Sequence, residues 1–276
     1  MHLISQRKMY WFFIFLFLLV SSTTASFPPC NRCVHQSTAA YYYEDSPTSY
    51  GGACGYGNLA LEISKGYFAA AVPSLYKGGA GCGACYQVRC KDKYLCNTAG
   101  TKIVLTDQNN DNTTDIVLSK KAFSAMALKG KAQRLLNTGR VDVEYKRIPC
   151  EYKNKNLLVQ VVEWSHKPYY LAIKFLYQGG QTDIQAVNIA KVGLPKWRPM
   201  KRNYGAIWDI NGVPEGGLQL RMVVTSRYDN GKWIWAGSVL PSGWKNGEIY
   251  DTGVQINDIA YEYCPPWQCG GDGQWK

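Results

Sequence analysis

The fold of the first half of this chain is decided by a stretch that begins Gly51-Gly52-Ala53-Cys54-Gly55-Tyr56-Gly57 and ends Gly81-Cys82-Gly83-Ala84-Cys85-Tyr86-Gln87-Val88-Arg89-Cys90. Glycine at this density lets backbone segments approach closely and turn through positive φ. An apolar run, residues 67–72, lies between the two ends, and residues 84–89 alternate between small or apolar and polar side chains, as a half-buried strand does. We therefore predict a disulfide-clamped β-structure built on this segment.

The first 25 residues have the pattern of a secretory signal. Arg7 and Lys8 precede an apolar run over residues 10–20, and the small residues that follow, with Thr23 and Ala25, suit a cleavage site. The run is shorter than the ~20 residues that a membrane span needs, which disfavours the alternative of a signal anchor. We expect a secreted protein without a membrane-spanning segment.

The mature chain is basic. The full sequence has 31 Lys and Arg against 20 Asp and Glu, so removal of Arg7 and Lys8 leaves 29 against 20 and a net charge near +9. Outside the cell such a charge suits acidic matrix polysaccharides, and it makes nucleic acid an unexpected partner. A charge that only keeps the protein soluble fits equally well.

The ten cysteines are distributed unevenly. Eight precede residue 151, and the other two, Cys264 and Cys269, lie near the C-terminus, so residues 151–263 must fold on a hydrophobic core alone. We therefore predict two domains, residues 26–150 and 151–260, followed by a cysteine-containing extension over residues 261–276.

An even number of cysteines in a secreted chain implies disulfides, although the connectivity stays open. Cys30-Asn31-Arg32-Cys33 has the spacing of a redox pair, or of half a zinc site completed by Cys264 and Cys269. The oxidising compartment favours structural disulfides over both. The sequence contains no convincing metal or organic cofactor site.

The rest of the first domain reads as short strands and one helix. Residues 103–106 predict a strand, and the polar loop after it contains the sequon Asn112-Thr113-Thr114, a candidate N-glycosylation site. Residues 116–118 predict another strand, and Ser119 caps an amphipathic helix predicted to end near Leu128. Residues 141–145 alternate cleanly, so a barrel of short strands with one helix is expected.

The second domain is predicted to be a β-sandwich. Glycine, proline or asparagine turns separate six strand-like segments, at residues 157–162, 169–177, 184–190, 218–225, 233–240 and 249–256. Alternation assigns the faces, because successive side chains of a strand point to opposite sides. It predicts that Leu171, Ile173, Phe175, Leu218, Leu220, Met222 and Val224 point inward, and that Tyr170, Lys174, Gln219, Arg221, Trp233 and Trp235 point outward.

The glycine-rich stretch, the cysteine spacing to Cys150 and the segment Trp197-Arg198-Pro199-Met200-Lys201-Arg202-Asn203-Tyr204-Gly205-Ala206-Ile207-Trp208 together resemble plant expansins. The extension with Cys264 and Cys269 resembles the expansin-like A branch. The resemblance covers nearly the whole mature chain in order. It implies an all-β protein of two domains, a six-stranded double-psi β-barrel similar to family-45 endoglucanases and an immunoglobulin-like β-sandwich that binds carbohydrate.

The resemblance also implies three disulfides, Cys54 with Cys82, Cys85 with Cys150, and Cys90 with Cys96. Cys30, Cys33, Cys264 and Cys269 fall outside that pattern. They are expected either to pair locally or to tie the two termini together.

The barrel departs from its relatives where a catalytic acid is expected. An inverting glycosidase needs a carboxylic acid and a carboxylate base on either side of a water. The family's Thr-Asp motif matches Thr106-Asp107, but the position of the acid is Val117, which cannot donate a proton. Asp115, two residues earlier, is the only nearby substitute, and solvated carboxylates at Asp107 and Asp115 are the simpler interpretation. We therefore expect no hydrolytic activity.

The resemblance also implies binding residues in both domains. Thr38 and the tyrosines at 41, 42 and 43 lie where the family has its groove threonine and tyrosine, and Tyr170 and Tyr204 lie on the flat sugar-binding face of the sandwich. Trp233 and Trp235 are candidates to extend that face, and Trp197 and Trp208 are expected in the core. Lys174, Lys201 and Arg202 are candidate contacts for acidic polymers, or ordinary solvated charges.

The sequence thus predicts a secreted, monomeric plant cell-wall protein that binds wall polysaccharides (cellulose, xyloglucan or another β-glucan, and acidic pectin) and loosens walls without hydrolysis. Two alternatives stay open. One is a weak inverting β-glucanase that uses Asp107 and Asp115. The other is a barwin-like carbohydrate-binding or defence protein without loosening activity.

Overall fold

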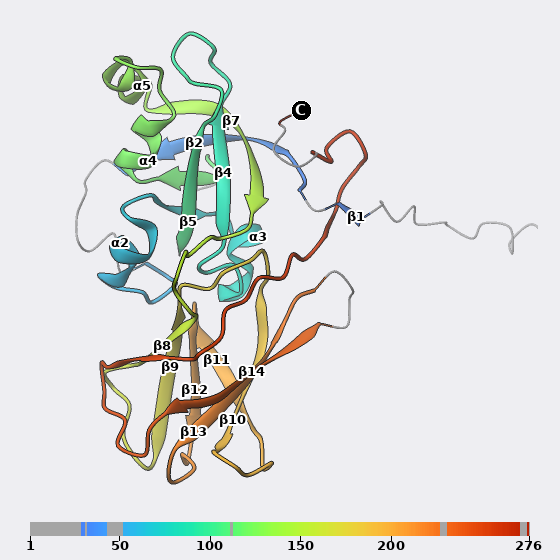
Figure 1. Ribbon diagram of the computed structural model, residues 1–276. Coiled ribbons are helices and arrows are strands. Elements are labelled where there is room, and N and C mark those ends of the chain that lie inside the picture. Colours follow the sequence, from blue (N-terminus) through green and yellow to red (C-terminus); the bar gives the residue numbers. More distant parts are fainter. Residues whose placement is uncertain are drawn as a thin grey trace, which may run out of the picture.

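The structure is a computed structural model that describes residues 29–30, 32–42, 52–110, 113–226, 231–270 and 275. The predicted signal and the sequon residue Asn112 lie outside this range. Figure 1 shows a β-barrel, formed by the first half of the chain, on top of a second body made of β-sheet. No helix among the described residues is long and apolar enough to cross a membrane.

The first body is a closed barrel of six strands in the order β2-β6-β3-β5-β4-β7. The pairs β2·β6 and β3·β5 are parallel, and the other neighbours are antiparallel. Leu105, Leu118 and Phe123 are fully buried in its core. The strands are β2 (His35–Tyr41), β3 (Phe68–Ala71), β4 (Cys85–Cys90), β5 (Thr101–Gln108), β6 (Ile116–Leu118) and β7 (Arg140–Ile148).

The prediction of one helix in the barrel domain is wrong. The predicted helix is present as α4 (Lys120–Ala125), and the Ser119 side chain caps it by accepting a hydrogen bond from the Ala122 N–H, but it ends three residues early. Helices this short span one or two turns, so they leave no periodic pattern in the sequence. The others are α2 (Leu59–Ser64), α3 (Pro73–Tyr76), the 3₁₀ turn η2 (Lys77–Gly79) and α5 (Ala132–Thr138).

The second body is an eight-stranded sheet, in the order β14-β13-β10-β11-β12-β9-β8-β15, that folds over on itself as a sandwich. Strand β11 belongs to both layers, and the apolar residues between the layers form one continuous core. The strands are β8 (Leu158–Val161), β9 (Tyr170–Leu176), β10 (Ile184–Lys191), β11 (Arg198–Tyr204), β12 (Ile207–Asn211), β13 (Leu218–Val224), β14 (Lys232–Leu240) and β15 (Ile249–Asp251).

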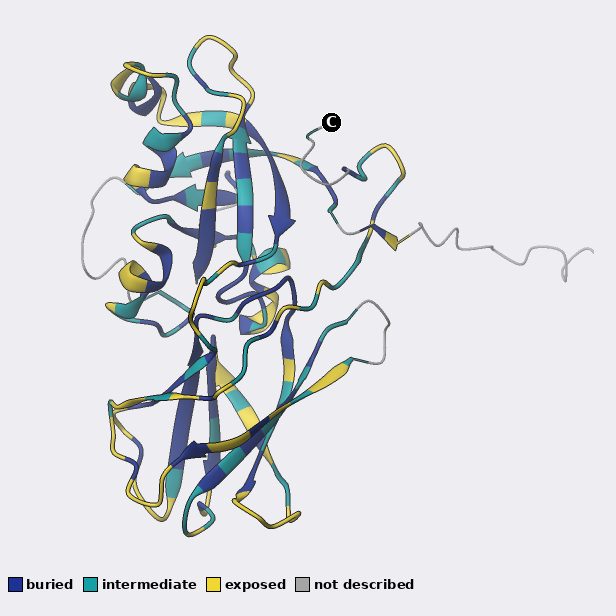
Figure 2. Ribbon diagram, in the orientation of Figure 1, coloured by how far each residue is buried: buried dark blue, intermediate teal, exposed yellow. Residues whose placement is uncertain are grey.

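Alternation predicts most faces of this sandwich correctly. The seven residues predicted to point inward are all buried in the core, and Trp233 and Trp235 are exposed (Figure 2). Strands β11 and β12 were not among the predicted strands, because β11 is largely polar and lacks the apolar alternation of its neighbours. One of its polar side chains, Arg202, contacts the barrel at the junction of the two bodies.

Five disulfides connect the ten cysteines. Three lie in the barrel domain, Cys54–Cys82, Cys85–Cys150 and Cys90–Cys96, and they are the pairings that the resemblance implies.

The other two disulfides, Cys30–Cys269 and Cys33–Cys264, tie the termini together. They flank a short antiparallel pair, β1 (Pro29–Cys30) with β16 (Glu262–Tyr263), which places the C-terminal extension beside the barrel (Figure 1). Because all four of these cysteines are in disulfides, none offers a free thiolate to a metal, and a zinc site there is excluded.

The two sequence motifs that carry the family resemblance meet at the junction of the two bodies. The Ala206 N–H donates to the Cys54 carbonyl, and Gly205 packs so closely against Cys54 that a Cβ there would lie 2.5 Å from the Cys54 Cα. The Arg202 guanidinium donates to the carbonyls of Gly79, Gly205 and Ile184. These contacts join the glycine-rich segment of the barrel to the polar strand β11 of the sandwich.

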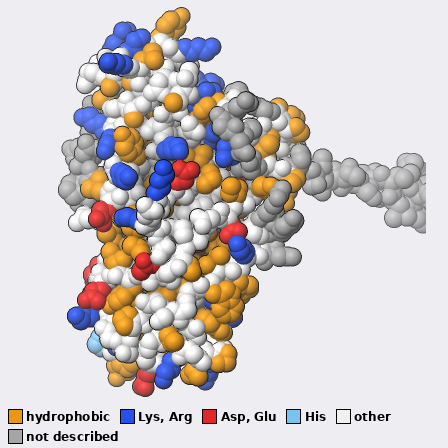
Figure 3. Space-filling model, viewed as in Figure 1, with side chains coloured by type: hydrophobic (Ala, Val, Ile, Leu, Met, Phe, Trp, Pro, Cys, Tyr) orange, Lys and Arg blue, Asp and Glu red, His pale blue; other side chains and the backbone are white. Residues whose placement is uncertain are grey.

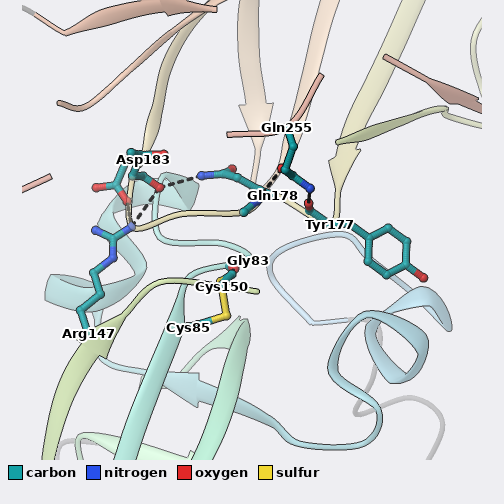
Figure 4. Close-up of a disulfide and its surroundings, with 10 residues drawn as sticks. Gly83, Cys85, Arg147, Cys150, Tyr177, Gln178, Asp183 and Gln255 are labelled. Atoms are coloured by element: carbon teal, nitrogen blue, oxygen red, sulfur yellow. Dashed lines mark hydrogen bonds and ion pairs between the residues drawn. A yellow bond between two sulfur atoms is a disulfide. The ribbon is translucent and has the colours of Figure 1, made fainter. Parts of the chain in front are cut away.

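A second part of the junction surrounds the Cys85–Cys150 disulfide (Figure 4). The backbones of Cys150 and Gly180 exchange two hydrogen bonds, 2.8 and 3.1 Å long. Beside them, the Asp183 carboxylate lies 2.5 Å from the Arg147 guanidinium and 2.9 Å from the Lys77 ammonium. Since Arg147 and Lys77 belong to the barrel and Asp183 to the sandwich, this buried ion cluster joins the two bodies.

Candidate functional site

Four barrel strands align a row of side chains on one face. Ala40 of β2 pairs with Val117 of β6, Val117 with Ala70 of β3, and Ala70 with Asp107 of β5. Directly paired residues of neighbouring strands point to the same side of a sheet. The side chains of the two alanines and the valine are short, so they form a shallow surface, and the Asp107 side chain lies at one end of this row.

Asp107 is held at its place by the glycine-rich stretch. Its Oδ1 accepts hydrogen bonds from the backbone N–H groups of Ala53, at 2.5 Å, and Gln108, at 2.8 Å. Gly52 makes this possible, because a Cβ there would lie 2.4 Å from the Thr106 carbonyl oxygen and 3.0 Å from the Asp107 Cβ. The Tyr42 hydroxyl donates to Asp107 Oδ2 at 3.4 Å, and burial together with the nearby carboxylate raises the pKa of Tyr42.

Among the described residues, no second acid faces Asp107 across this row. The paired position two strands away, ~10 Å at the usual strand spacing, is Val117. Asp115 accepts a 2.6 Å hydrogen bond from the Ser37 hydroxyl. Ser37 is an odd-numbered residue of β2, like the buried Ala39, so it lies on the face opposite to Ala40. Among the described residues, Asp107 and Asp115 share no hydrogen-bond partner.

The structure places the candidate groove tyrosines Tyr41 and Tyr42 on opposite faces of the barrel wall. Tyr41 turns towards the helices, where its ring packs on Phe123 at 4.9 Å and its hydroxyl donates to the Leu136 carbonyl. Tyr42, the next residue, lies on the other face and reaches Asp107. Thr38 shares the face of Ala40 and donates to the Thr113 carbonyl at 3.4 Å. Tyr43 lies outside the described residues.

A hollow of about 430 Å³ continues from Gly52 onto the second body. Glycine backbone lines its barrel side, and a tyrosine, a tryptophan and several polar residues line its sandwich side. The surface beside Asp107 and the surface of the sandwich are therefore parts of one connected face. The lining residues are Gly52, Gly55, Tyr56, Gly57, Asn58, Leu59, Gln160, Glu163, Trp164, Lys174 and Tyr204.

A β-bulge turns Tyr204 outward onto this face. Arg202 pairs with Trp208, a core residue, so regular alternation would leave Tyr204 on the inner face with Arg202. The register shifts between Arg202 and Tyr204, and Tyr204 pairs instead with Ile207, whose side chain lies on the outer face. Tyr204 is 42% exposed as a result.

Tyr204, Trp164 and Tyr170 form an aromatic group on the outer face of β9, β12 and β11, which we call the aromatic platform. Trp164 is 50% exposed, and it lies close enough to Tyr170 to affect the pKa of that phenol. The Tyr170 hydroxyl in turn donates to Asp209 at 2.8 Å, and partial burial and this carboxylate raise the pKa of Tyr170. The hydrogen bond to Asp209 helps to fix the half-buried Tyr170 ring on this face.

Sequence reasoning missed Trp164. It lies in the turn after β8, where no alternation assigns a face, and only its size and its place between two polar residues could have indicated an exposed ring. It is nevertheless the largest exposed side chain lining the hollow.

Two of the three cations proposed as contacts for acidic polymers serve the junction instead. Lys174 is 6% exposed and donates to the Gly55 carbonyl at 2.9 Å, and burial lowers its pKa. Arg202 is bound to three carbonyls and lies 4.2 Å from the Trp208 ring centre. Only Lys201 is exposed. Backbone carbonyl oxygens of the protein therefore accept the hydrogen bonds of Lys174 and Arg202, and these two cations are not available to a polymer.

The structure separates Trp233 and Trp235 from the aromatic platform. They lie on β14, on the outer face of the other layer of the sandwich, where Trp197 packs edge-on against Trp235 at 5.4 Å between ring centres. The prediction that Trp197 belongs to the core is therefore wrong, whereas Trp208 is buried there as predicted. Trp197 precedes β11, and the strand alternation that begins at residue 198 does not extend to it.

Comparisons with known proteins agree with this architecture. A family model described as Expansin C-terminal domain matches residues 159–241, and a model described as Lytic transglycolase matches residues 68–145. Expansin-like A1 of Arabidopsis thaliana is 53% identical over 257 residues, covering 92% of this chain and 96% of that protein. Expansin-like A3 of Oryza sativa subsp. japonica is 48% identical over 240 residues, covering 85% and 87%.

Two solved structures share the fold. The crystal structure of apo Clavibacter michiganensis expansin superposes with a TM-score of 0.61 at 19% identity, covering 82% of this chain and 99% of that chain. A structure of a mutant of the same expansin in complex with cellohexaose gives a TM-score of 0.60.

Together these findings define an all-β protein in which a six-stranded double-psi β-barrel precedes an immunoglobulin-like β-sandwich of the carbohydrate-binding type. The chain belongs to the expansin family, in its expansin-like A branch.

Proposed function

We propose that this chain is a secreted plant cell-wall protein that binds wall β-glucans, such as cellulose or xyloglucan, along the face shared by its two bodies, and that it loosens the wall without cutting the polymer. The observation that carries this proposal is the hollow that runs from Gly52, beside Asp107, to Trp164 and Tyr204 of the aromatic platform, with a valine where a second carboxyl group would complete a hydrolytic pair.

The aromatic platform suits a glucan chain. A β-linked glucan presents apolar C–H faces at regular intervals, and aromatic rings with open faces stack on them while phenol and indole groups contact the hydroxyls. Tyr204 and Trp164 provide two such exposed rings, and the half-buried Tyr170 lies on the same sheet face. The complex of the related Clavibacter michiganensis expansin with cellohexaose supports a ligand of this class.

The barrel supplies polar contacts rather than an acid–base pair. An inverting hydrolase holds its carboxyl groups ~6.5–9.5 Å apart and a retaining one ~5–5.5 Å apart, and both need one protonated group. Val117 occupies the position two strands away from Asp107 in the same row of paired residues. The Asp115 carboxylate is hydrogen-bonded to Ser37 on another face. We therefore propose that the barrel contacts a glucan through Asp107 and Tyr42 and disturbs its packing against neighbouring chains.

Slow extension of heat-inactivated wall strips under constant load tests this proposal. We expect the purified mature protein to increase the extension while the release of reducing ends from glucan stays at the level of buffer, in the wild type and in the Asp107→Asn variant alike. Extension must be measured from acidic to neutral pH.

Two outcomes would contradict the proposal. Reducing ends that appear with the wild type and vanish with Asp107→Asn would establish the weak β-glucanase. No extension at any pH, with binding to wall material intact, would establish a binding protein that has no loosening activity.

A further inference from the structure

A second aromatic group, with two exposed rings, lies on the layer opposite to the aromatic platform. It consists of Trp197, Trp233 and Trp235 around Arg221, and we call it the Trp–Arg cluster. Trp233 and Trp235 are 44% and 53% exposed. Figure 3 shows hydrophobic side chains gathered on the visible face of the lower body, in the area that β14 occupies in Figure 1.

The register of two strands builds this cluster. In β13 the alternate residues Leu220 and Met222 are fully buried, which puts Arg221 on the outer face. Pairing with β14 places Trp235 directly beside Arg221 and Trp233 two residues further along the same face. Trp197 belongs to the loop that follows β10, and hydrogen bonds from Gln219 hold the start of this loop.

Gln219 points outward on the same face, and its amide donates to the carbonyls of Lys191 and Leu194 at 3.0 Å each. These bonds fix the start of the loop that carries Trp197. The third indole is therefore held in place beside the β-hairpin.

The Arg221 guanidinium is fixed, but its charge is not paired with a carboxylate of any described residue. Its carbon lies 4.5 Å from the ring centres of Trp197 and Trp233 and 5.2 Å from that of Trp235. Its Nε donates to the Asn188 side chain at 3.0 Å. Within the described part of the chain, no carboxylate pairs with it and its terminal nitrogens have no hydrogen-bond acceptor, so cation–π contacts orient the group without neutralising it.

We propose that the Trp–Arg cluster is a second carbohydrate site and that it binds uronic-acid units of an acidic polysaccharide. A pre-oriented guanidinium suits the bidentate recognition of a carboxylate, and the exposed indoles suit the C–H face of the same pyranose ring. The cluster lies on an open sheet, which admits an internal unit of a long chain. The excess of 31 basic over 20 acidic side chains attracts such a polyanion.

This inference goes beyond the proposed function, because the two sites lie on opposite layers of one sandwich and can be occupied together. A neutral glucan on the aromatic platform and an acidic chain on the Trp–Arg cluster would then be held by one protein molecule. Neither site depends on a residue of the other.

Titration calorimetry with the purified mature protein and a galacturonic acid hexamer tests the inference. Loss of a charge-assisted bidentate contact predicts that Arg221→Gln binds the hexamer about tenfold or more weakly than the wild type. The methyl-esterified hexamer, which lacks the charge, is expected to bind the wild type as weakly as the acidic hexamer binds Arg221→Gln. Trp235→Ala is expected to weaken the binding of both hexamers.

The control variant is Lys129→Gln, which removes one positive charge from an exposed position of the barrel domain. It is expected to bind the acidic hexamer within about twofold of the wild type, since surface charges beyond the Debye length are largely screened. Equal losses in Lys129→Gln and Arg221→Gln would show general charge attraction and overturn the inference. A wild type that does not bind the acidic hexamer would overturn it as well.

Cellulose retention distinguishes failure of this inference from failure of the proposed function. Arg221→Gln is expected to be retained on cellulose like the wild type, and the Trp164→Ala/Tyr204→Ala double variant is expected to bind the acidic hexamer like the wild type. Thermal unfolding of each variant shows whether it is folded. Loss of hexamer binding in the double variant would place the uronate on the aromatic platform and contradict a second site.

Discussion

Replacement of Asp183 by asparagine is expected to lower the free energy of unfolding by about 3–5 kcal/mol, the range for breaking a buried ion pair by removing one partner. The Arg147 and Asp183 side chains are only 5% and 9% exposed, so the variant leaves a buried guanidinium without a counter-charge at the junction of the two bodies (Figure 4). Lys77 is 39% exposed, and solvent screens its share of the interaction. Urea denaturation followed by tryptophan fluorescence measures the change.

The same cluster makes a prediction for pH. Burial alone raises the pKa of Asp183, but the charges of Arg147 and Lys77 outweigh it and hold the pKa below its ordinary value of 3.8. A carboxyl group whose pKa is lower in the folded state stabilises the protein above the unfolded-state pKa and loses that contribution as the pH falls through the folded-state pKa. The difference in stability between wild type and Asp183→Asn should therefore be constant above about pH 4 and shrink below it.

Asp258→Asn is the matched control for Asp183→Asn, because Asp258 pairs with Lys232 at 2.8 Å on the surface, where the lysine side chain is 53% exposed. An exposed pair contributes about 0–1 kcal/mol. If the two variants lost the same stability, the cluster of Asp183, Arg147 and Lys77 would not join the two bodies as described.

Removal of the two disulfides that tie the termini is expected to have the second large effect. Cys33→Ser/Cys264→Ser should cost about 3 kcal/mol, since Cys30–Cys269 still holds the ends together and only a small ring is opened. Replacement of all four cysteines by serine frees a loop with a sequence separation of 239 and should cost about 5 kcal/mol more on the chain-entropy model. Denaturation of the two variants side by side measures the increment.

The two-cysteine variant serves as the control for the four-cysteine variant, because both lose the Cys33–Cys264 bond and differ only in the last link between the termini. Equal stability of the two would mean that the terminal link does not restrict the unfolded chain. The three barrel disulfides are unchanged in both variants.

Much of the architecture follows from the sequence because strand alternation and turn residues are local signals. The inward faces of β9 and β13 could be assigned from period-two patterns alone, and the exposure of Trp233 and Trp235 followed from the same rule. The three barrel disulfides could be inferred only from the family resemblance. The pairing of the termini could be inferred from neither, because it depends on where the folded body places them.

The junction and the aromatic platform were harder to predict because both depend on contacts between distant parts of the chain. Alternation places Lys174 on the outer face correctly, but it cannot show that the barrel covers that position. Tyr204 is exposed only because of a bulge in β11. Trp164 lies in a turn, where strand alternation cannot assign a side chain to either face of the sheet. The sequence could not choose between Tyr41 and Tyr42 as the groove tyrosine, because a register uncertain by one residue exchanges the two faces of a strand.

Retention on cellulose of the Trp164→Ala/Tyr204→Ala variant tests most directly the central claim, that the aromatic platform binds glucan. Stacking contributes roughly 0.5–1.5 kcal/mol per ring beyond the buried area, so loss of two rings should lower the affinity about tenfold or more. Tyr94→Ala is the control, because Tyr94 is 83% exposed on the barrel domain and outside the hollow. Retention lost in the double variant and kept in Tyr94→Ala is the predicted result, and retention unchanged in the double variant would contradict the account.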